Sequence, residues 1–476
     1  MKQLSGLDSA FVYLETATTP MHIGSLCIYD QSTAPGGVVG FKDIIRFFGE
    51  RLHKAKAFRQ RLVTVPMSLG HPYWIEDPEF DLEFHLRHIA LPKPGDWRQL
   101  CILTARLLSR PLDMNRPLWE AWVIEGLNNV EGVPKNSFAI VSKVHHAAID
   151  GISGAEIAAA LHGFSPDDEI EPPETPWVPD REPTSLEMLG RNLINDAKLP
   201  VKLGRFAYDG AKSLTRLAAG LITKQIRLPG GAPRTRFNDN VSAHRVFDAV
   251  TFDLNEIKKI KTSCEGATVN DVMLTICGGA LRKYLASKEE LPERSLVAMA
   301  PVSIRQDDQR GEEGNLVSVL SIPIRSDIDD PLERLHAVHA ESSEAKRFTF
   351  TAGPEVGMEL FGFIPSTTTG LTARAYGKLR LAERFSPTFN TVITNVPIGK
   401  QTLYSMGSQM VAYYGLGPVF HGVGLFQALM GYGDNITVNV VSCRKMMPDP
   451  AFYCECLRES FEECRSRTRD VSNNRP

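Results

Sequence analysis

The sequence predicts a mixed α/β fold made of two halves that are joined by a crossover segment. Helix-like and strand-like periodicities alternate in the first third of the chain and again in its second half. A length of 476 residues exceeds what one hydrophobic core usually serves. The composition shifts sharply at Ser165, where a segment rich in proline and acidic residues begins. We therefore expect an N-terminal subdomain over 1–164, a crossover over 165–240 and a C-terminal subdomain over 241–476.

Three elements are expected in the N-terminal subdomain. Residues 41–62 place basic and apolar side chains at helical spacing, which predicts a basic amphipathic helix. Residues 137–144 are largely apolar and β-prone, which predicts a buried strand. A helical pattern then begins at Ile152 and continues to about His162, where Gly163 supplies a stop signal.

The crossover opens with the segment SPDDEIEPPETPWVPDREP, whose closely spaced prolines exclude a continuous helix or a central strand. The pattern is helical again from about Ser185 to Leu228. Within it, residues 198–227 carry many basic residues and a single acid, Asp209, interleaved with apolar side chains. Such a segment could lie on an anionic bilayer surface. It could equally pack its apolar stripe on the body of the protein, and the sequence leaves both alternatives open.

The C-terminal subdomain shows the same mixture of periods, and no internal repeat is evident. Strands are expected in VFDAVTFDL, SLVAMAPVSIR, NLVSVLSIPI, NTVITNVPIG and NITVNVVSC. Helices are expected in VNDVMLTICGGALRKYL, DPLERLHAVHAESSEAKR and DPAFYCECLRESFEECR.

Bulk properties argue against several classes of protein. A net charge of -3 is unlike that of a protein built chiefly to neutralise nucleic-acid phosphates. Asp8 interrupts the apolar run that a signal peptide needs, and no stretch approaches the ~20 apolar residues that span a bilayer. The 8 cysteines are scattered without matched Cys-x-x-Cys pairs, so we expect neither a zinc site nor a disulfide scaffold. Free cysteines of this kind indicate that the protein works in a reducing cytoplasm.

The sharpest chemical signal is His145-His146-Ala-Ala-Ile-Asp150-Gly151, placed between an expected strand and an expected helix. Successive strand residues face opposite sides, so only one of the two histidines can point at a substrate. A neutral imidazole is well suited to take a proton from an alcohol at physiological pH.

Other interpretations of the same residues stay open at this point. One histidine could be packed and the other solvated, with Asp150 as a helix cap and Gly151 as a turn residue. A metal site formed by His146 and Asp150 lacks an evident third ligand. Ser153 lies outside a Gly-x-Ser-x-Gly elbow, which disfavours an acyl-serine intermediate.

The string HHAAIDG resembles the HHxxxDG signature of the CoA-dependent acyltransferase superfamily, which includes chloramphenicol acetyltransferase, peptide-synthetase condensation domains and plant alcohol acyltransferases. Further motifs follow in order along the chain. They are LDSAFVYLE, PMHIG, FDLEFHLRHIALPKPG, PLWE, Asn270-Asp271-Val272, PVSIR and Asn395-Val396-Pro397. The ordered set resembles the bacterial wax ester synthase/acyl-CoA:diacylglycerol acyltransferase family over nearly the whole chain.

The resemblance implies two chloramphenicol-acetyltransferase-like subdomains with an active-site tunnel between them. It implies that His146 is the general base that deprotonates the hydroxyl of diacylglycerol or a long-chain fatty alcohol, and that no acyl-enzyme forms. His145, Asp150 and Gly151 would complete the motif in supporting roles, with Asp150 pairing with an arginine to shape the loop.

The resemblance also suggests where other functional groups lie. Thr394 and Asn395 are the candidates for stabilising the developing oxyanion. Asn270 and Asp271 would support the site, although a helix cap is the alternative role. Arg305 would meet CoA or a structural acid.

The expected ligands follow from the same resemblance. Acyl-CoA would be a co-substrate, with no bound cofactor, no metal and no nucleic acid. We expect a cytoplasmic protein in peripheral contact with the inner membrane or with lipid inclusions. The alternatives are a condensation-domain-like acyltransferase, a non-catalytic lipid-droplet-binding protein and a metal-dependent hydrolase. Residues 420–440 look longer than the family pattern, and the choice between diacylglycerol and alcohol stays open.

Overall fold

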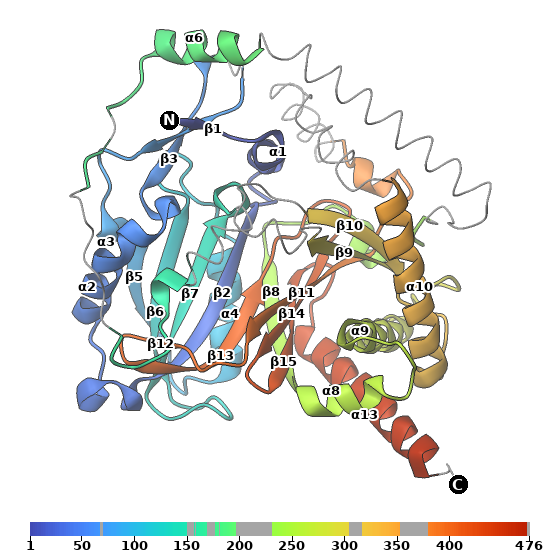
Figure 1. Cartoon of the computed structure of the whole chain (residues 1–476). Coiled ribbons are helices and arrows are strands. Elements are labelled where there is room, and N and C mark those ends of the chain that lie inside the picture. The colour runs from blue at the N-terminus through green and yellow to red at the C-terminus, as the bar shows by residue number, and fades with distance from the viewer. Residues whose placement is uncertain are drawn as a thin grey trace.

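Two six-stranded mixed sheets lie next to each other in the computed structural model and form the centre of the molecule (Figure 1). The structure describes residues 1–66, 70–149, 157, 159–168, 177–179, 181–196, 231–303, 317–352 and 379–473. The expected mixed α/β fold is confirmed, since both sheets combine parallel and antiparallel pairs and carry helices.

The N-terminal sheet has the strand order β12-β13-β2-β7-β6-β5. Its strands are β2 (His22–Asp30), β5 (Leu86–Ala90), β6 (Trp119–Leu127), β7 (Ser137–His145), β12 (Tyr404–Ser405) and β13 (Ser408–Leu416). Only β5 and β6 run parallel, and β13 pairs antiparallel with β2. The sheet therefore takes two strands from the segment 241–476, which the sequence analysis assigns as a whole to the C-terminal subdomain.

The C-terminal sheet has the order β10-β9-β11-β14-β15-β8. Its strands are β8 (Arg245–Asp253), β9 (Val297–Ser303), β10 (Val317–Pro323), β11 (Thr391–Gly399), β14 (Leu425–Tyr432) and β15 (Asn435–Cys443). Strand β11 runs parallel to both β9 and β14. Every strand expected in this half of the chain is present in the structure.

Helices cover both sheets (Figure 1). In the C-terminal half, α8 (Leu254–Lys261), α9 (Val269–Ala286), α10 (Pro331–Ala352) and α13 (Pro450–Asn473) pack against one another and on the sheet. In the N-terminal half, α2 (Phe41–Arg51) and α3 (Leu82–His85) lie on one face, and α4 (Trp97–Leu108) packs on β8 of the other sheet. Helices α1 (Gly6–Leu14) and α6 (Ser185–Asp196) lie towards one end of the molecule, near a small sheet of β1 (Lys2–Gln3), β3 (Gln60–Val63) and β4 (Tyr73–Glu76).

A single hydrophobic core crosses the boundary between the two halves. It joins Leu26 and Trp122 of the N-terminal sheet to Leu274 and Val438 of the C-terminal half. The helix that bridges them is α4, whose Trp97 donates a 2.8 Å hydrogen bond from Nε1 to Asp248 Oδ1 of β8. Shared burial of this kind ties the two halves into one packed unit.

The expectation of one helix over 41–62 is wrong. Helix α2 ends at Arg51, short 3-10 turns follow, and β3 then pairs antiparallel with β4. Leu52, Phe58 and Leu62 are all buried, so the apolar spacing is real, but it serves three different elements. Pairing with a strand that is distant in sequence decided the backbone conformation here, which a local periodicity does not report.

The segment 420–440 contributes to the centre of the C-terminal sheet. It holds β14 and the first part of β15, joined by a tight turn at Gly433-Asp434 in which Gly433 has a φ of 60°. A positive φ at the first turn residue favours glycine and fits a two-residue hairpin loop. The segment that the sequence analysis describes as long therefore includes a core hairpin.

The contact between α9 and the chain after β10 gives a prediction about stability. A methyl group on Gly278 would lie 2.2 Å from the Ile324 carbonyl oxygen. We expect Gly278→Ala to lower the free energy of unfolding by ~1–3 kcal/mol, because the backbone must shift. Gly190→Ala in α6 is the control: its methyl would meet no described atom within 4 Å. This control is expected to gain ~0.5–1 kcal/mol. Urea denaturation of both variants provides the comparison, and equal effects would contradict the prediction.

None of the helices among the described residues is both long enough and apolar enough to cross a membrane. The basic segment 198–227 lies outside the described residues.

Candidate active site

The paired histidines lie at the end of β7, and backbone hydrogen bonds to neighbouring segments continue through His146, one residue past the strand. His145 N–H donates to the Leu118 carbonyl at 2.9 Å, and His146 N–H donates to the Met21 carbonyl at 2.8 Å. His145 is the last residue of β7 and is buried, whereas His146 begins the 3-10 turn η6 (His146–Ala148) and is half-buried.

His145 is fully buried, and each of its ring nitrogens lies close to a polar atom. Its Nδ1 accepts a 3.0 Å hydrogen bond from the Ala147 N–H, so the neutral ring carries its proton on Nε2. That Nε2 lies 3.1 Å from Oε2 of Glu15, which also accepts a 2.8 Å hydrogen bond from the Met21 N–H. His145 therefore holds the chain around the motif, and its full burial keeps the ring away from a substrate.

His146 is half-buried, and the ring of Phe11 stacks on its imidazole with centroids 3.9 Å apart and an interplanar angle of 13°. Burial lowers the pKa of His146 to about 4; a hydrogen bond to its own backbone carbonyl opposes the shift, and neighbouring His145 adds to it. At neutral pH the imidazole of His146 is therefore uncharged and able to accept a proton.

The second cluster of expected site residues comes from two elements of the C-terminal half. Asn395 of β11 donates from Nδ2 to Oδ1 of Asn270, in the first turn of α9, over 3.2 Å. Asn395 is exposed and Thr394 beside it is half-buried. The structure thus pairs two of the expected residues that are 125 positions apart in the sequence.

Asp271 is a helix-capping residue in this structure. Its Oδ2 accepts hydrogen bonds of 2.9 Å from both the backbone N–H and the hydroxyl of Thr268, which completes a capping box for α9. The same oxygen lies 3.0 Å from Nδ1 of His339 on α10. Asp150, Gly151 and Arg305, which the sequence analysis also selects, lie outside the described residues.

Sequence reasoning missed three residues that surround the histidines. Phe11 and Glu15 contact His146 and His145 from α1 and the residue after it. His22, paired opposite His145, is buried and donates from Nε2 to the Leu108 carbonyl at 2.6 Å; burial lowers its pKa to about 3. Phe11 and Glu15 belong to the LDSAFVYLE motif, and His22 belongs to PMHIG. Their membership of these motifs is the sequence feature that could have identified them as site residues.

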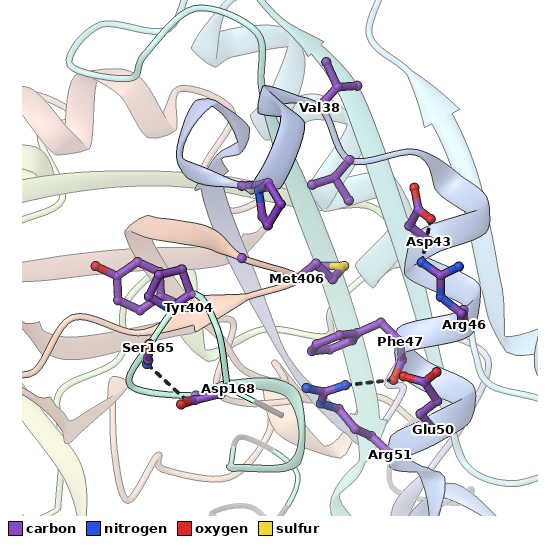
Figure 2. A pocket seen from close by; sticks show the side chains of 16 residues that line it. Val38, Asp43, Arg46, Phe47, Glu50, Arg51, Ser165, Asp168, Tyr404 and Met406 are labelled. Atoms are coloured by element: carbon purple, nitrogen blue, oxygen red, sulfur yellow. Dashed lines mark hydrogen bonds and ion pairs between the residues drawn. The ribbon is translucent and has the colours of Figure 1, made fainter. Parts of the chain in front are cut away.

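A cavity of about 820 Å³ lies at the far end of the same sheet (Figure 2). Its lining includes Phe47 and Arg51 of α2, Met406 in the β12–β13 turn, and Ala34, which follows β2. Strand β2 starts beside His145 and ends near this cavity, so about eight residues, or roughly 26 Å, separate the two places. The cavity is therefore distinct from the surroundings of His146.

No group of three or more His, Cys, Asp or Glu side chains in the described part of the chain is arranged to hold a metal ion.

Two mixed sheets with a histidine pair at a strand end define the class of the two-subdomain, chloramphenicol-acetyltransferase-like acyltransferases. Solved structures share this fold. A trichothecene 15-O-acetyltransferase from Fusarium sporotrichioides matches with a TM-score of 0.60 at 10% identity, over 97% of this chain and 94% of that chain. The starter condensation domain of rhizomide synthetase matches with a TM-score of 0.57 at 13% identity, over 98% and 94%.

The chain belongs to the wax ester synthase/diacylglycerol acyltransferase family. The profile of the family's catalytic domain matches residues 4–273, and that of its C-terminal domain matches residues 313–465. A Mycobacterium tuberculosis protein named as a diacylglycerol O-acyltransferase is 32% identical over 97% of this chain and 90% of its own length. A wax ester synthase/diacylglycerol acyltransferase from Marinobacter aquaeolei VT8 has a TM-score of 0.67 at 26% identity, over 98% of this chain and 100% of that chain. The chain is accordingly an O-acyltransferase.

Proposed function

We propose that this enzyme transfers a long-chain acyl group from acyl-CoA to the hydroxyl of diacylglycerol or of a long-chain fatty alcohol. The products are triacylglycerol or wax ester, together with free CoA. The observation that carries the proposal is the state of His146, a neutral and half-buried imidazole whose neighbour His145 is locked in place by Glu15. Related proteins whose names give these two activities support the choice of substrates.

In the proposed reaction, the imidazole of His146 takes the hydroxyl proton as the alcohol oxygen attacks the thioester carbonyl. The tetrahedral intermediate collapses with cleavage of the carbon–sulfur bond. The imidazolium then returns the proton to the CoA sulfur, so that the base is regenerated and no acyl-enzyme forms. A positioned base of this kind typically contributes ~10²–10⁴ in rate.

The oxyanion of the tetrahedral intermediate needs hydrogen-bond donors, and we assign this role to Thr394 and Asn395. An Asn side chain has two N–H donors. Asn270 accepts one of the two from Asn395 Nδ2, which fixes the amide plane and leaves the second to be directed at the intermediate. Donors that are oriented before the reaction stabilise the transition state without a reorganisation cost.

The remaining motif residues receive roles by family position. Asp150 and Gly151 would shape the loop after His146, and Arg305 would contact CoA. We propose a cytoplasmic enzyme that meets its lipid substrates at the inner membrane or at lipid inclusions, with the basic segment 198–227 as the candidate contact. Acyl-CoA is a substrate, and the reaction as written requires no metal.

Release of free thiol from palmitoyl-CoA tests this function. Purified enzyme is supplied with detergent or liposomes and with hexadecanol or dioleoylglycerol in separate reactions. We expect release that depends on an acceptor, together with formation of the matching ester, and the two rates rank the acceptors. Absence of release with either acceptor, from protein shown to be folded, would contradict the assignment.

The pH dependence of kcat/KM follows from the pKa of His146. Because the neutral imidazole is the active form, activity is lost as the pH falls through the folded-state pKa. That pKa is lowered from 6.5 to about 4, so the acidic limb of the profile is expected near pH 4. Initial rates at subsaturating acyl-CoA between pH 3.5 and 8, with circular dichroism to follow folding, measure it. An acidic limb centred near 6.5 would contradict the assignment of a buried base.

A further inference from the structure

Two side-chain hydrogen bonds tie the first turn of α9 to two other elements of the C-terminal half. His339 on α10 meets Asp271, and Asn395 on β11 donates to Asn270, the residue before Asp271. The backbone of the first turn of α9 joins the two contacts. Of these four residues, only Asn395 is a candidate for contact with the reacting atoms. The other three set its surroundings.

The buried carboxylate of Asp271 has few hydrogen-bond partners, and His339 is one of them. The Asp271 side chain is 1% exposed, and its Oδ1 has no hydrogen-bond partner among the described residues. The hydrogen bonds of its side chain all converge on Oδ2, two from Thr268 and one at 3.0 Å from His339 Nδ1. His339 is the one basic side chain that the described part of the chain places within 4.0 Å of this carboxylate.

The His339 ring also holds the turn that leads into α9. Gly266 in that turn has a φ of 77°, and a methyl group there would lie 3.3 Å from His339 Nε2. The imidazole is therefore packed against the backbone before Thr268 while its other nitrogen meets Asp271. Contacts on both sides fix the position of the first turn of α9 relative to α10.

We propose that His339 is a positioning residue for the acyl transfer, acting through Asp271 and Asn270 on the amide of Asn395. The inference rests on the proposed function, because it requires Asn395 to stabilise the oxyanion. When His339 is lost, the first turn of α9 is less firmly held, and the Asn270 oxygen no longer fixes the amide plane. The transition state loses stabilisation while the binding of acyl-CoA is retained.

The test is a double-mutant cycle in the full-length enzyme, with kcat and KM measured for palmitoyl-CoA. His339→Ala is expected to lower kcat on the order of tenfold with little change in KM, a fraction of the ~10²–10³ that a lost oxyanion donor costs. In the Asn395→Ala background the same substitution is expected to have no further effect, because the group it positions is absent. His339→Asn, whose side-chain amide can still donate to Asp271, is expected to restore part of kcat.

His336→Ala provides the matched control, since His336 is exposed on the same helix one turn away. It is expected to leave kcat unchanged. Multiplicative effects of His339→Ala and Asn395→Ala would overturn the inference, as would a loss confined to thermal stability. A wild-type enzyme without acceptor-dependent turnover would instead overturn the proposed function.

Discussion

His146→Ala is expected to abolish most acyl transfer, lowering kcat/KM by ~10²–10⁴. Of the two histidines in the motif, His145 is fully buried, whereas His146 is half-buried and its imidazole is neutral at pH 7. Alanine cannot accept the hydroxyl proton, so the alcohol must attack without deprotonation. Acceptor-dependent thiol release from palmitoyl-CoA by wild type and variant gives the ratio.

The fold should survive this substitution. The surroundings of His146 disfavour its protonated form, so the wild-type side chain lowers the free energy of unfolding as the pH falls below 6.5. The alanine variant does not carry this cost. We expect the variant to keep the circular dichroism spectrum and the palmitoyl-CoA affinity of the wild type. His145→Ala is the contrasting variant: it removes a buried ring that joins Ala147 to Glu15, and loss of stability is expected to accompany its loss of activity. Retention of more than half of the activity by His146→Ala would refute the role of this residue as base.

Glu120→Ala is expected to destabilise the protein by ~3–5 kcal/mol, the largest stability effect that we anticipate. Glu120 Oε2 lies 3.3 Å from Nζ of Lys143, whose side chain is 1% exposed in the centre of the N-terminal sheet. Burial lowers the pKa of Lys143, and the charge of Glu120 opposes that shift. Removing the carboxylate leaves a buried ammonium group with hydrogen bonds to the Leu107 and Arg110 carbonyls and a contact with the Trp122 ring, but with no negative charge from Glu120. Chemical denaturation at pH 7 measures the loss.

Two further variants separate the buried pair from ion pairs in general. Replacement of both partners, Glu120→Leu with Lys143→Met, is expected to recover most of the stability because no buried charge remains. Arg347→Ala breaks the exposed pair with Glu344 and is expected to cost less than ~1 kcal/mol. If Glu120→Ala lowers the free energy of unfolding no more than Arg347→Ala does, the prediction is wrong. The ammonium of Lys143 would then be hydrated or deprotonated at little cost in free energy.

The sequence by itself determined the mixed α/β class and most of the helices and strands, and it identified His146 as the candidate base. Long, strongly periodic segments such as α9, β11 and β15 were predicted almost to their ends, because their apolar spacing matches the period of the element they form. The motif at His145 and His146 was visible because its residues are consecutive. The capping role of Asp271 was also a local property, since Thr268 is three residues away.

Only the tertiary structure decided which distant residues meet. Strand β13 completes the N-terminal sheet although it follows β11 of the other sheet in the chain, and β3 interrupts what looked like one helix. The carboxylate of Glu15 lies beside His145, 130 residues further along the chain, and the pairing of Asn270 with Asn395 spans 125 residues. Such contacts depend on strand order and helix packing, which are set by the burial of the whole chain. A periodicity reports which face of an element is apolar, but it carries no record of the element that will cover that face.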